Sequence, residues 1–143
     1  GVDSIEPFIS HKGKGVFILC RTSNPSGAEF QSQKINNSSY LYESVAVWAN
    51  SLNKGDNVGL VVGATAPEEL SAVRNIVPDL PLLIPGVGAQ GGDLEHSVKV
   101  GNSSGIGLIN VSRSISFAGD LSESAIRSSA ESFVSRMNKA IHE

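Results

Sequence analysis

Residues 58–77 read VGLVVGATAPEELSAVRNIV, and this stretch decides the fold of the chain. It opens with a continuously apolar run at 58–62, which is typical of a strand buried on both faces. A helix start follows, because Thr65 can cap the first turn and a proline and two glutamates suit the positions after it. The helix is expected to end near Val77, before a proline. The stretch therefore predicts one strand-helix unit of a parallel sheet.

Similar units lie on both sides of this stretch. Amphipathic or capped helical patterns separate the apolar runs, so the order α–β–α–β–α–β–α–β–α with right-handed crossovers is expected. Pro81 lies in one run and suits only the first position of a strand or an edge. The other apolar runs are 16–20 (VFILC), 80–84 (LPLLI) and 106–111 (IGLINV), and the other expected helices are 3–12, 41–52, 93–100 and 122–141.

Length and composition exclude several classes of protein. The 143 residues fit a single domain over 1–143, with 40% hydrophobic residues for a core, and are too few for a complete (β/α)₈ barrel of ~250 residues. The net charge of −3 offers no basic excess for nucleic acid, and no apolar run approaches a membrane span. The N-terminus shows no signal-peptide pattern. The single cysteine, Cys20, predicts a reducing, cytoplasmic setting and an inert core thiol.

Candidate functional residues follow the predicted strands. Ligands of α/β proteins bind beyond the carboxyl ends of the strands, so the segments 21–24, 63–65, 85–93 and 112–114 form the expected site. The polar stretch 24–39 is long and poor in helical pattern, which predicts a functional lid or local disorder. The three histidines show no metal-ligand spacing, and no pair of groups suited to proton transfer follows a strand. Neither a metal site nor a cofactor is expected.

The loop after the third run is rich in glycine. Gly86, Gly88 and Gly91 match GxGxxG between a strand and a helix, which resembles a dinucleotide fingerprint. No acidic residue ends a strand about 20 residues later, as that fingerprint requires. A loop whose backbone N–H groups approach an anion fits better, and a plain turn remains open.

Arg113 follows the fourth run and precedes a short helical stretch. A guanidinium in this place can bind phosphate through two parallel hydrogen bonds. In barrels, the phosphate site is frequently built by the loops after strands seven and eight. The alternative is a solvated arginine at a strand end.

Four segments together resemble the second half of orotidine 5′-monophosphate decarboxylases, closest to the bacterial group. They are VFILCRTSNPSGAEFQ, VGLVVGATAPEELSAVR, LLIPGVGAQGGD and INVSRSISFAG, and the resemblance covers essentially the whole chain. It implies an α/β fold that is the C-terminal half, strands 5–8, of a (β/α)₈ TIM barrel with parallel strands. It implies a lyase of pyrimidine biosynthesis that forms uridine monophosphate from orotidine monophosphate without cofactor or metal.

The resemblance also implies substrate-binding roles. Ser23 matches the serine that hydrogen-bonds the pyrimidine, and Gln90 matches the glutamine that bridges pyrimidine or ribose and phosphate. Arg113, with the backbone at Ser112, matches the phosphate clamp, although many relatives have glycine at the position of Ser112. Pro85 and Gly86 match the base of the closing loop, which continues through Gly91.

The family's Asp-x-Lys-x-x-Asp motif is absent, so no catalytic residue is expected in this chain. The resemblance implies that the lysine and its carboxylates lie in a missing N-terminal half, that the complete enzyme is a homodimer, and that the isolated chain is inactive. Two other functions remain open: a non-catalytic half-barrel that binds phosphorylated ligands and self-associates, and a three-layer dinucleotide-binding domain.

Overall fold

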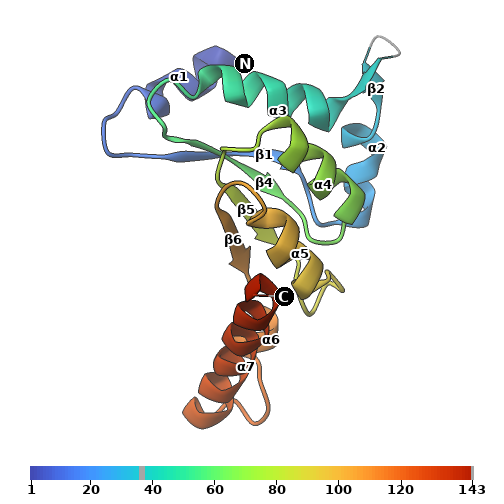
Figure 1. Ribbon diagram of the computed structural model, residues 1–143, viewed down its shortest axis with the longest axis vertical. Coiled ribbons are helices and arrows are strands. Elements are labelled where there is room, and N and C mark those ends of the chain that lie inside the picture. Colours follow the sequence, from blue (N-terminus) through green and yellow to red (C-terminus); the bar gives the residue numbers. More distant parts are fainter. Residues whose placement is uncertain (36–37, 143) are drawn as a thin grey trace.

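The computed structural model describes residues 1–35 and 38–142 of the chain (Figure 1). Apart from short elements within residues 25–40 and a short helix at 113–116, its strands and helices follow the predicted order. The strands of the main sheet are β1 (Val16–Arg21), β4 (Val58–Val62), β5 (Leu82–Pro85) and β6 (Gly107–Asn110). The helices outside the loop after β1 are α1 (Val2–Ile9), α3 (Leu41–Leu52), α4 (Pro67–Ile76), α5 (Leu94–Gly101), α6 (Arg113–Ser116) and α7 (Glu123–His142).

The main sheet has the order β1-β4-β5-β6, and each neighbouring pair is parallel. A helix connects each strand to the next, as parallel pairing requires. The carboxyl ends therefore meet at one edge, where Arg21 is paired with Val62 and Pro85 with Asn110. The prediction of an α/β fold with a parallel sheet is confirmed, and the loops that follow the strands are brought together.

Helices cover one face of the main sheet. Ile18, Leu60 and Leu82 point into this core and are at most 8% exposed. The opposite face is open: Leu19 is 57% exposed and Leu108 is 45% exposed. The prediction that the runs are buried on both faces is wrong for the edge strands β1 and β6, whereas the central strand β4 is buried along almost its whole length.

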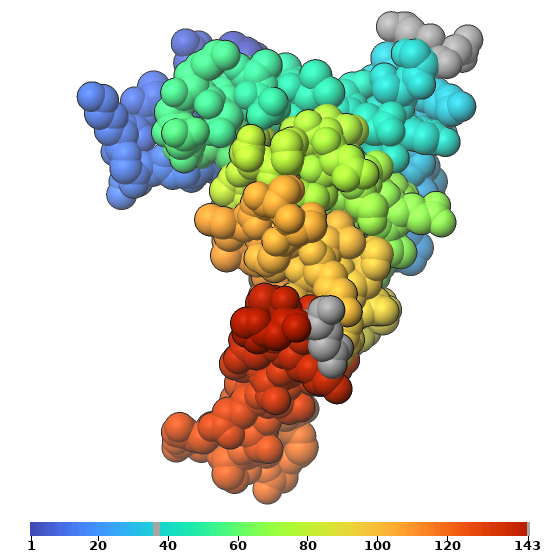
Figure 2. Space-filling model, in the orientation of Figure 1, coloured from blue at the N-terminus to red at the C-terminus, as the bar shows by residue number. Residues whose placement is uncertain are grey.

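The carboxyl-terminal helices project from the body of the molecule. Figures 1 and 2 show α7, in red, standing out beyond the sheet and its covering helices. Two hydrogen bonds tie α7 to α5, from Arg136 Nε to Glu95 Oε1 at 2.9 Å and from Arg136 Nη2 to Glu95 Oε2 at 3.0 Å. No helix in the described part of the chain is long and apolar enough to cross a membrane.

Most predicted boundaries differ from the observed ones by one or two residues, and three differences, in α1, β5 and α4, are informative. Helix α1 ends at Ile9 rather than at residue 12, and β5 begins at Leu82, after Pro81. Proline has no N–H for the ladder, but the Pro81 carbonyl still accepts a hydrogen bond from Leu60 N at 2.9 Å. The N-cap of α4 is Ala66, so the predicted Thr65 cap is wrong. Thr65 Oγ1 instead donates to a carbonyl in the loop after β1.

The loop after β1 has more regular structure than the sequence predicts. It contains η1 (Pro25–Gly27) and α2 (Ala28–Gln31), followed by the antiparallel strands β2 (Lys34–Ile35) and β3 (Ser39–Tyr40). Positions 36 and 37 of the predicted lid lie outside the described residues. The short helices carry the chain away from the sheet edge and back toward α3.

A buried arginine joins the amino-terminal side of the sheet to its helices. Arg74, in α4, is 2% exposed. Burial lowers the pKa of its guanidinium, an effect that nearby Asp79 opposes. The guanidinium fixes the ends of α4 and α5 and the starts of two strands. Its Nη1 donates to the carbonyls of Val77, Pro78 and Leu80 at 2.8–3.2 Å, and its Nη2 donates to those of Gly101 and Ile106 at 2.7 and 3.2 Å.

Candidate active site

A cleft of about 520 Å³ lies at the carboxyl ends of the main-sheet strands. Loops after β1, β4, β5 and β6 all contribute to its wall, which confirms that the topology gathers the segments named from the sequence. The lining residues are Arg21, Ser23, Asn24, Pro25, Thr65, Ala89, Gln90 and Arg113. Six of these eight residues have polar side chains, which can form hydrogen bonds with a small polar ligand.

Ser23 is fixed between two loops. Its Oγ donates to Gln90 Oε1 at 3.2 Å, and its carbonyl accepts from Thr65 Oγ1 at 2.7 Å. Gly86 allows this approach, because a methyl group there would lie 2.8 Å from Ser23 Cβ. The backbone of Gly86 has φ +98°, a conformation that favours glycine. The family resemblance gives Ser23 and Gln90 separate substrate-binding roles, and in the structure the two side chains lie side by side.

The glycine-rich loop between β5 and α5 is held by its own backbone. Gly91 N donates to Gly88 O at 2.8 Å, and Gly92 N donates to Gly86 O at 3.0 Å. Asp93 is the N-cap of α5, because its side chain accepts a hydrogen bond from His96 N at 2.9 Å. Because these two glycine N–H groups bond within the loop, an anion here must be bound by other donors.

Arg113 lies where the loops after β5 and β6 meet. A second, smaller cavity of about 210 Å³ is lined by Pro85, Gly86, Val87, Ala89, Gln90, Asn110, Ser112 and Arg113. The Arg113 side chain belongs to both cavities and is exposed. Helix α6, which begins with Arg113, is fixed to α7 because Ser129 Oγ donates to Ser114 O at 2.9 Å. The Arg113 guanidinium therefore extends from a short helix that is fixed to α7.

The two cavities include all predicted binding residues except Gly91, whose place in the loop is next to Gln90. The sequence did not predict the bond from Thr65 to Ser23, or the ion pair between Arg21 Nε and Glu69 Oε1 at 3.2 Å. The only sequence signal for these contacts is that Thr65 and Arg21 each follow an apolar run. Cys20 lies outside the cleft, and burial raises the pKa of its thiol to about 12, in agreement with the predicted inert core thiol.

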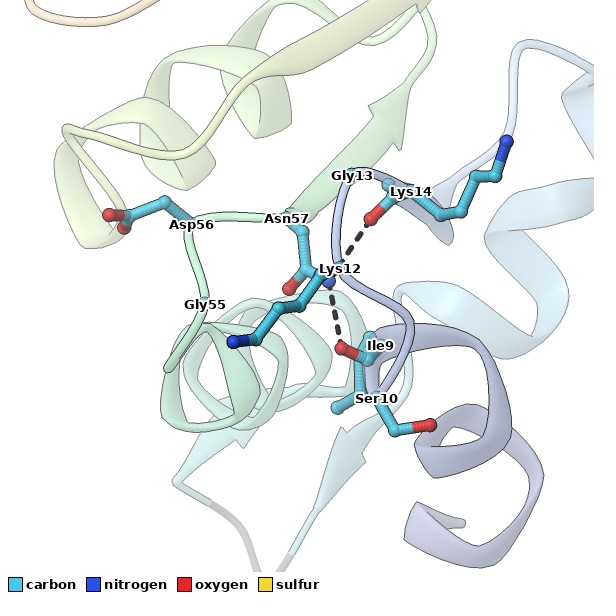
Figure 3. A pocket seen from close by; sticks show the side chains of 9 residues that line it. Ile9, Ser10, Lys12, Gly13, Lys14, Gly55, Asp56 and Asn57 are labelled. Atoms are coloured by element: carbon cyan, nitrogen blue, oxygen red, sulfur yellow. Dashed lines mark hydrogen bonds between the residues drawn. The ribbon is translucent and has the colours of Figure 1, made fainter.

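A third cavity, of about 480 Å³, lies at the opposite end of the strands (Figure 3). Asn57 joins its two loops, because Nδ2 donates to Ile9 O at 2.8 Å and to Lys14 O at 3.1 Å. In Figure 3 the Lys14 side chain points away from the other labelled side chains, while that of Lys12 extends toward Gly55. Ligands of parallel α/β sheets bind at the other end, so these contacts serve stability.

A protein-family model decides the relationship of this chain to known proteins. The model of the orotidine 5′-phosphate decarboxylase / HUMPS family matches residues 1–127. The chain belongs to this family. The family resemblance stated from the sequence motifs is therefore confirmed.

Curated members of the family share about half of their aligned residues with this chain. Orotidine 5′-phosphate decarboxylase of Natronomonas pharaonis is 58% identical over 120 residues, which are 84% of this chain and 44% of that protein. The same enzyme of Dehalococcoides mccartyi is 51% identical over 130 residues, or 87% of this chain and 48% of that protein. The chain thus spans less than half the length of these decarboxylases.

Two solved structures share the fold of nearly the whole chain. UMP synthase of Leishmania donovani superposes with a TM-score of 0.82 at 42% identity, covering 96% of this chain and 31% of that one. OMP decarboxylase of the same organism gives 0.79 at 38% identity, covering 96% of this chain and 54% of that one. The chain therefore covers only part of each of these two structures. The covered fractions do not confirm the prediction that the chain is the C-terminal half of a barrel.

Proposed function

We propose that this chain forms the substrate-binding part of an orotidine 5′-monophosphate decarboxylase, a lyase that releases carbon dioxide and forms uridine monophosphate. One observation carries the proposal: Ser23, Gln90 and Arg113 come from three different loops and line one cleft. A hydroxyl, an amide and a guanidinium suit the pyrimidine, the ribose and the phosphate of a nucleotide. The sequence and fold of known decarboxylases support the same substrate.

In this proposal Arg113 binds the phosphate, and Ser23 and Gln90 bind the pyrimidine and ribose side. The Ser23–Gln90 hydrogen bond joins the loop after β1 to the loop after β5 above the ligand. Interactions with the phosphate, which does not react, supply binding energy that keeps these loops closed over the reacting carbon. The chain's contribution to the rate is therefore the formation of a closed site.

The proton donor of the reaction must come from elsewhere. Among the described residues, no lysine follows a strand of the main sheet at its carboxyl end. The open apolar face and the edge strands β1 and β6 need a covering partner, because exposed edges and apolar faces drive association. We therefore assign to the chain strands five to eight of a barrel, with the Asp-x-Lys-x-x-Asp motif in the remaining part.

Co-expression tests this assignment. The chain is expressed alone, with a family fragment of strands one to four that carries the motif, or with a fragment of strands five to eight. We expect decarboxylation of orotidine monophosphate only with the first fragment, in a stable complex by sedimentation. Turnover by the chain alone, or with the second fragment, would contradict the proposal. A stable homodimer that binds phosphorylated ligands but gains no activity would instead support a non-catalytic half-barrel.

A further inference from the structure

One side-chain oxygen accepts three hydrogen bonds within the loop after β1 and from the end of that strand. Gln31 Oε1, at the end of α2, accepts from Thr22 N at 2.9 Å, from Thr22 Oγ1 at 3.1 Å and from Arg21 Nη1 at 3.4 Å. Thr22 immediately precedes Ser23. The far end of the short helices is thus bonded back to the last residue of β1 and the first residue of the loop.

Arg21 extends this network to the neighbouring helix. Its Nε donates to Glu69 Oε1 in α4 at 3.2 Å, and its Nη1 donates to Thr22 O at 3.0 Å. The Arg21 side chain is 9% exposed and that of Glu69 is 23% exposed, so solvent weakens this pair less than a surface pair. Although Arg21 lines the cleft, these contacts direct its guanidinium toward protein groups.

The backbone of the loop packs directly on these contacts. A methyl group on Gly27 would overlap Thr22 Oγ1 and would lie 2.9 Å from both Arg21 Nη1 and Gln31 Oε1. The turn at η1 therefore closes over the network with no space for a side chain. Gln31 holds the residue before Ser23, because its Oε1 accepts from Thr22 N. Thr65 holds Ser23 itself, because its Oγ1 donates to the Ser23 carbonyl.

We propose that Gln31 and Arg21 are positioning residues, which hold Ser23 where its hydroxyl can reach Gln90 and the pyrimidine of the ligand. This inference rests on the proposed function and deepens it. Gln31 acts as an acceptor in all three contacts, so a carboxylate can replace its amide and an apolar side chain cannot. Phosphate binding at Arg113 does not depend on this network.

The test uses the complete barrel, with this chain co-expressed with its remaining part. Affinities for uridine monophosphate and for inorganic phosphate are measured separately. We expect Gln31→Leu and Arg21→Gln to weaken nucleotide binding about tenfold, and to leave phosphate binding unchanged. Gln31→Glu should retain nucleotide affinity. Arg127→Gln is the matched control for Arg21→Gln, because each substitution removes a guanidinium from an ion pair. Arg127 pairs with Glu123 on the exposed surface of α7.

The outcomes separate the two proposals. If the wild-type barrel binds no nucleotide, the proposed function fails. If it binds nucleotide but Gln31→Leu has no effect, or Gln31→Glu is as defective as Gln31→Leu, the positioning role is wrong. Loss of phosphate binding in Arg21→Gln would also overturn it, because Arg21 would then be a direct anion ligand. An equal loss of both affinities in Gln31→Leu would indicate a folding defect and would likewise contradict the proposal.

Discussion

Ser23 Oγ lies 3.2 Å from Gln90 Oε1, although the two residues are 67 positions apart in the sequence. The parallel order of the main sheet causes this contact, because it brings the carboxyl ends of β1 and β5 to the same edge with β4 between them. Their loops meet above the end of β4, where Gly63 N donates to Arg21 O and Ala64 N donates to Pro85 O, each at 2.8 Å. The site thus depends on close approaches of backbone as well as on polar side chains.

Gly86→Ala is expected to disrupt the Ser23–Gln90 contact. The added methyl would lie 2.8 Å from Ser23 Cβ and 3.1 Å from Gln90 Oε1, and alanine is strained at φ +98°. In the complete barrel we expect affinity for uridine monophosphate to fall roughly tenfold or more. Gly91→Ala is the matched control, because Gly91 also has positive φ (+86°) but a methyl there meets nothing within 4 Å. Equal effects of the two variants would show that the contact with Ser23 is unimportant.

Arg113→Ala is expected to weaken binding of phosphorylated ligands in the complete barrel. A charge-assisted hydrogen bond contributes about 1.5–3 kcal/mol, so the Kd for uridine monophosphate should rise about 10- to 150-fold. Affinity for uridine, which lacks the phosphate, should change little. Arg127→Ala removes an exposed guanidinium of α7 and should leave both affinities unchanged. Unchanged nucleotide affinity in Arg113→Ala would remove the phosphate-clamp assignment.

The sequence predicts the strands and the location of the cleft, but not its internal contacts. Continuous apolar runs identify β1, β4, β5 and β6, and residues after parallel strands must converge at one edge. The Thr65–Ser23 bond is not predictable, because its acceptor is a backbone carbonyl that every residue has. The Arg21–Glu69 pair joins residues 48 positions apart, and nothing in the composition of the chain selects that partner. The sequence predicts that the face with Leu19 and Leu108 is buried, but both side chains are exposed. A run of apolar residues indicates that a face must be covered, but it does not indicate which chain covers it.

Arg74→Met is expected to lower the stability of the complete barrel without changing its ligand preference. The guanidinium donates to carbonyls of two helix ends and of the segments that start β5 and β6, and these acceptors would lose their partner in a buried place. We expect the free energy of unfolding, measured with urea, to fall by about 3 kcal/mol. Arg127→Met, on the surface, should change it by less than about 0.5 kcal/mol. A small effect of Arg74→Met would mean that water replaces the guanidinium at these carbonyls.

Cys20 is expected to make stability fall at alkaline pH. Its thiol is 2% exposed and donates to Tyr42 O at 3.2 Å, and burial raises its pKa from 9.0 to about 12. Burial also raises the pKa of Tyr42 from 10.0 to about 12. Because the folded state holds these protons more tightly, their stabilisation is complete below pH 9 and is lost as pH rises from 9 toward 12.

For Cys20 this loss amounts to about 1.4 kcal/mol for each pH unit above 9, until the folded-state pKa is reached. Urea unfolding of the complete barrel at pH 8 and pH 10.5 should therefore show a steeper decline for wild type than for Cys20→Ala. Iodoacetamide should alkylate Cys20 at pH 8 only after denaturation, because the native thiol is buried from the reagent and its raised pKa suppresses the reactive thiolate. Rapid alkylation of the native protein, or equal pH dependence of the two proteins, would show that the thiol is not held in a closed core beneath α3.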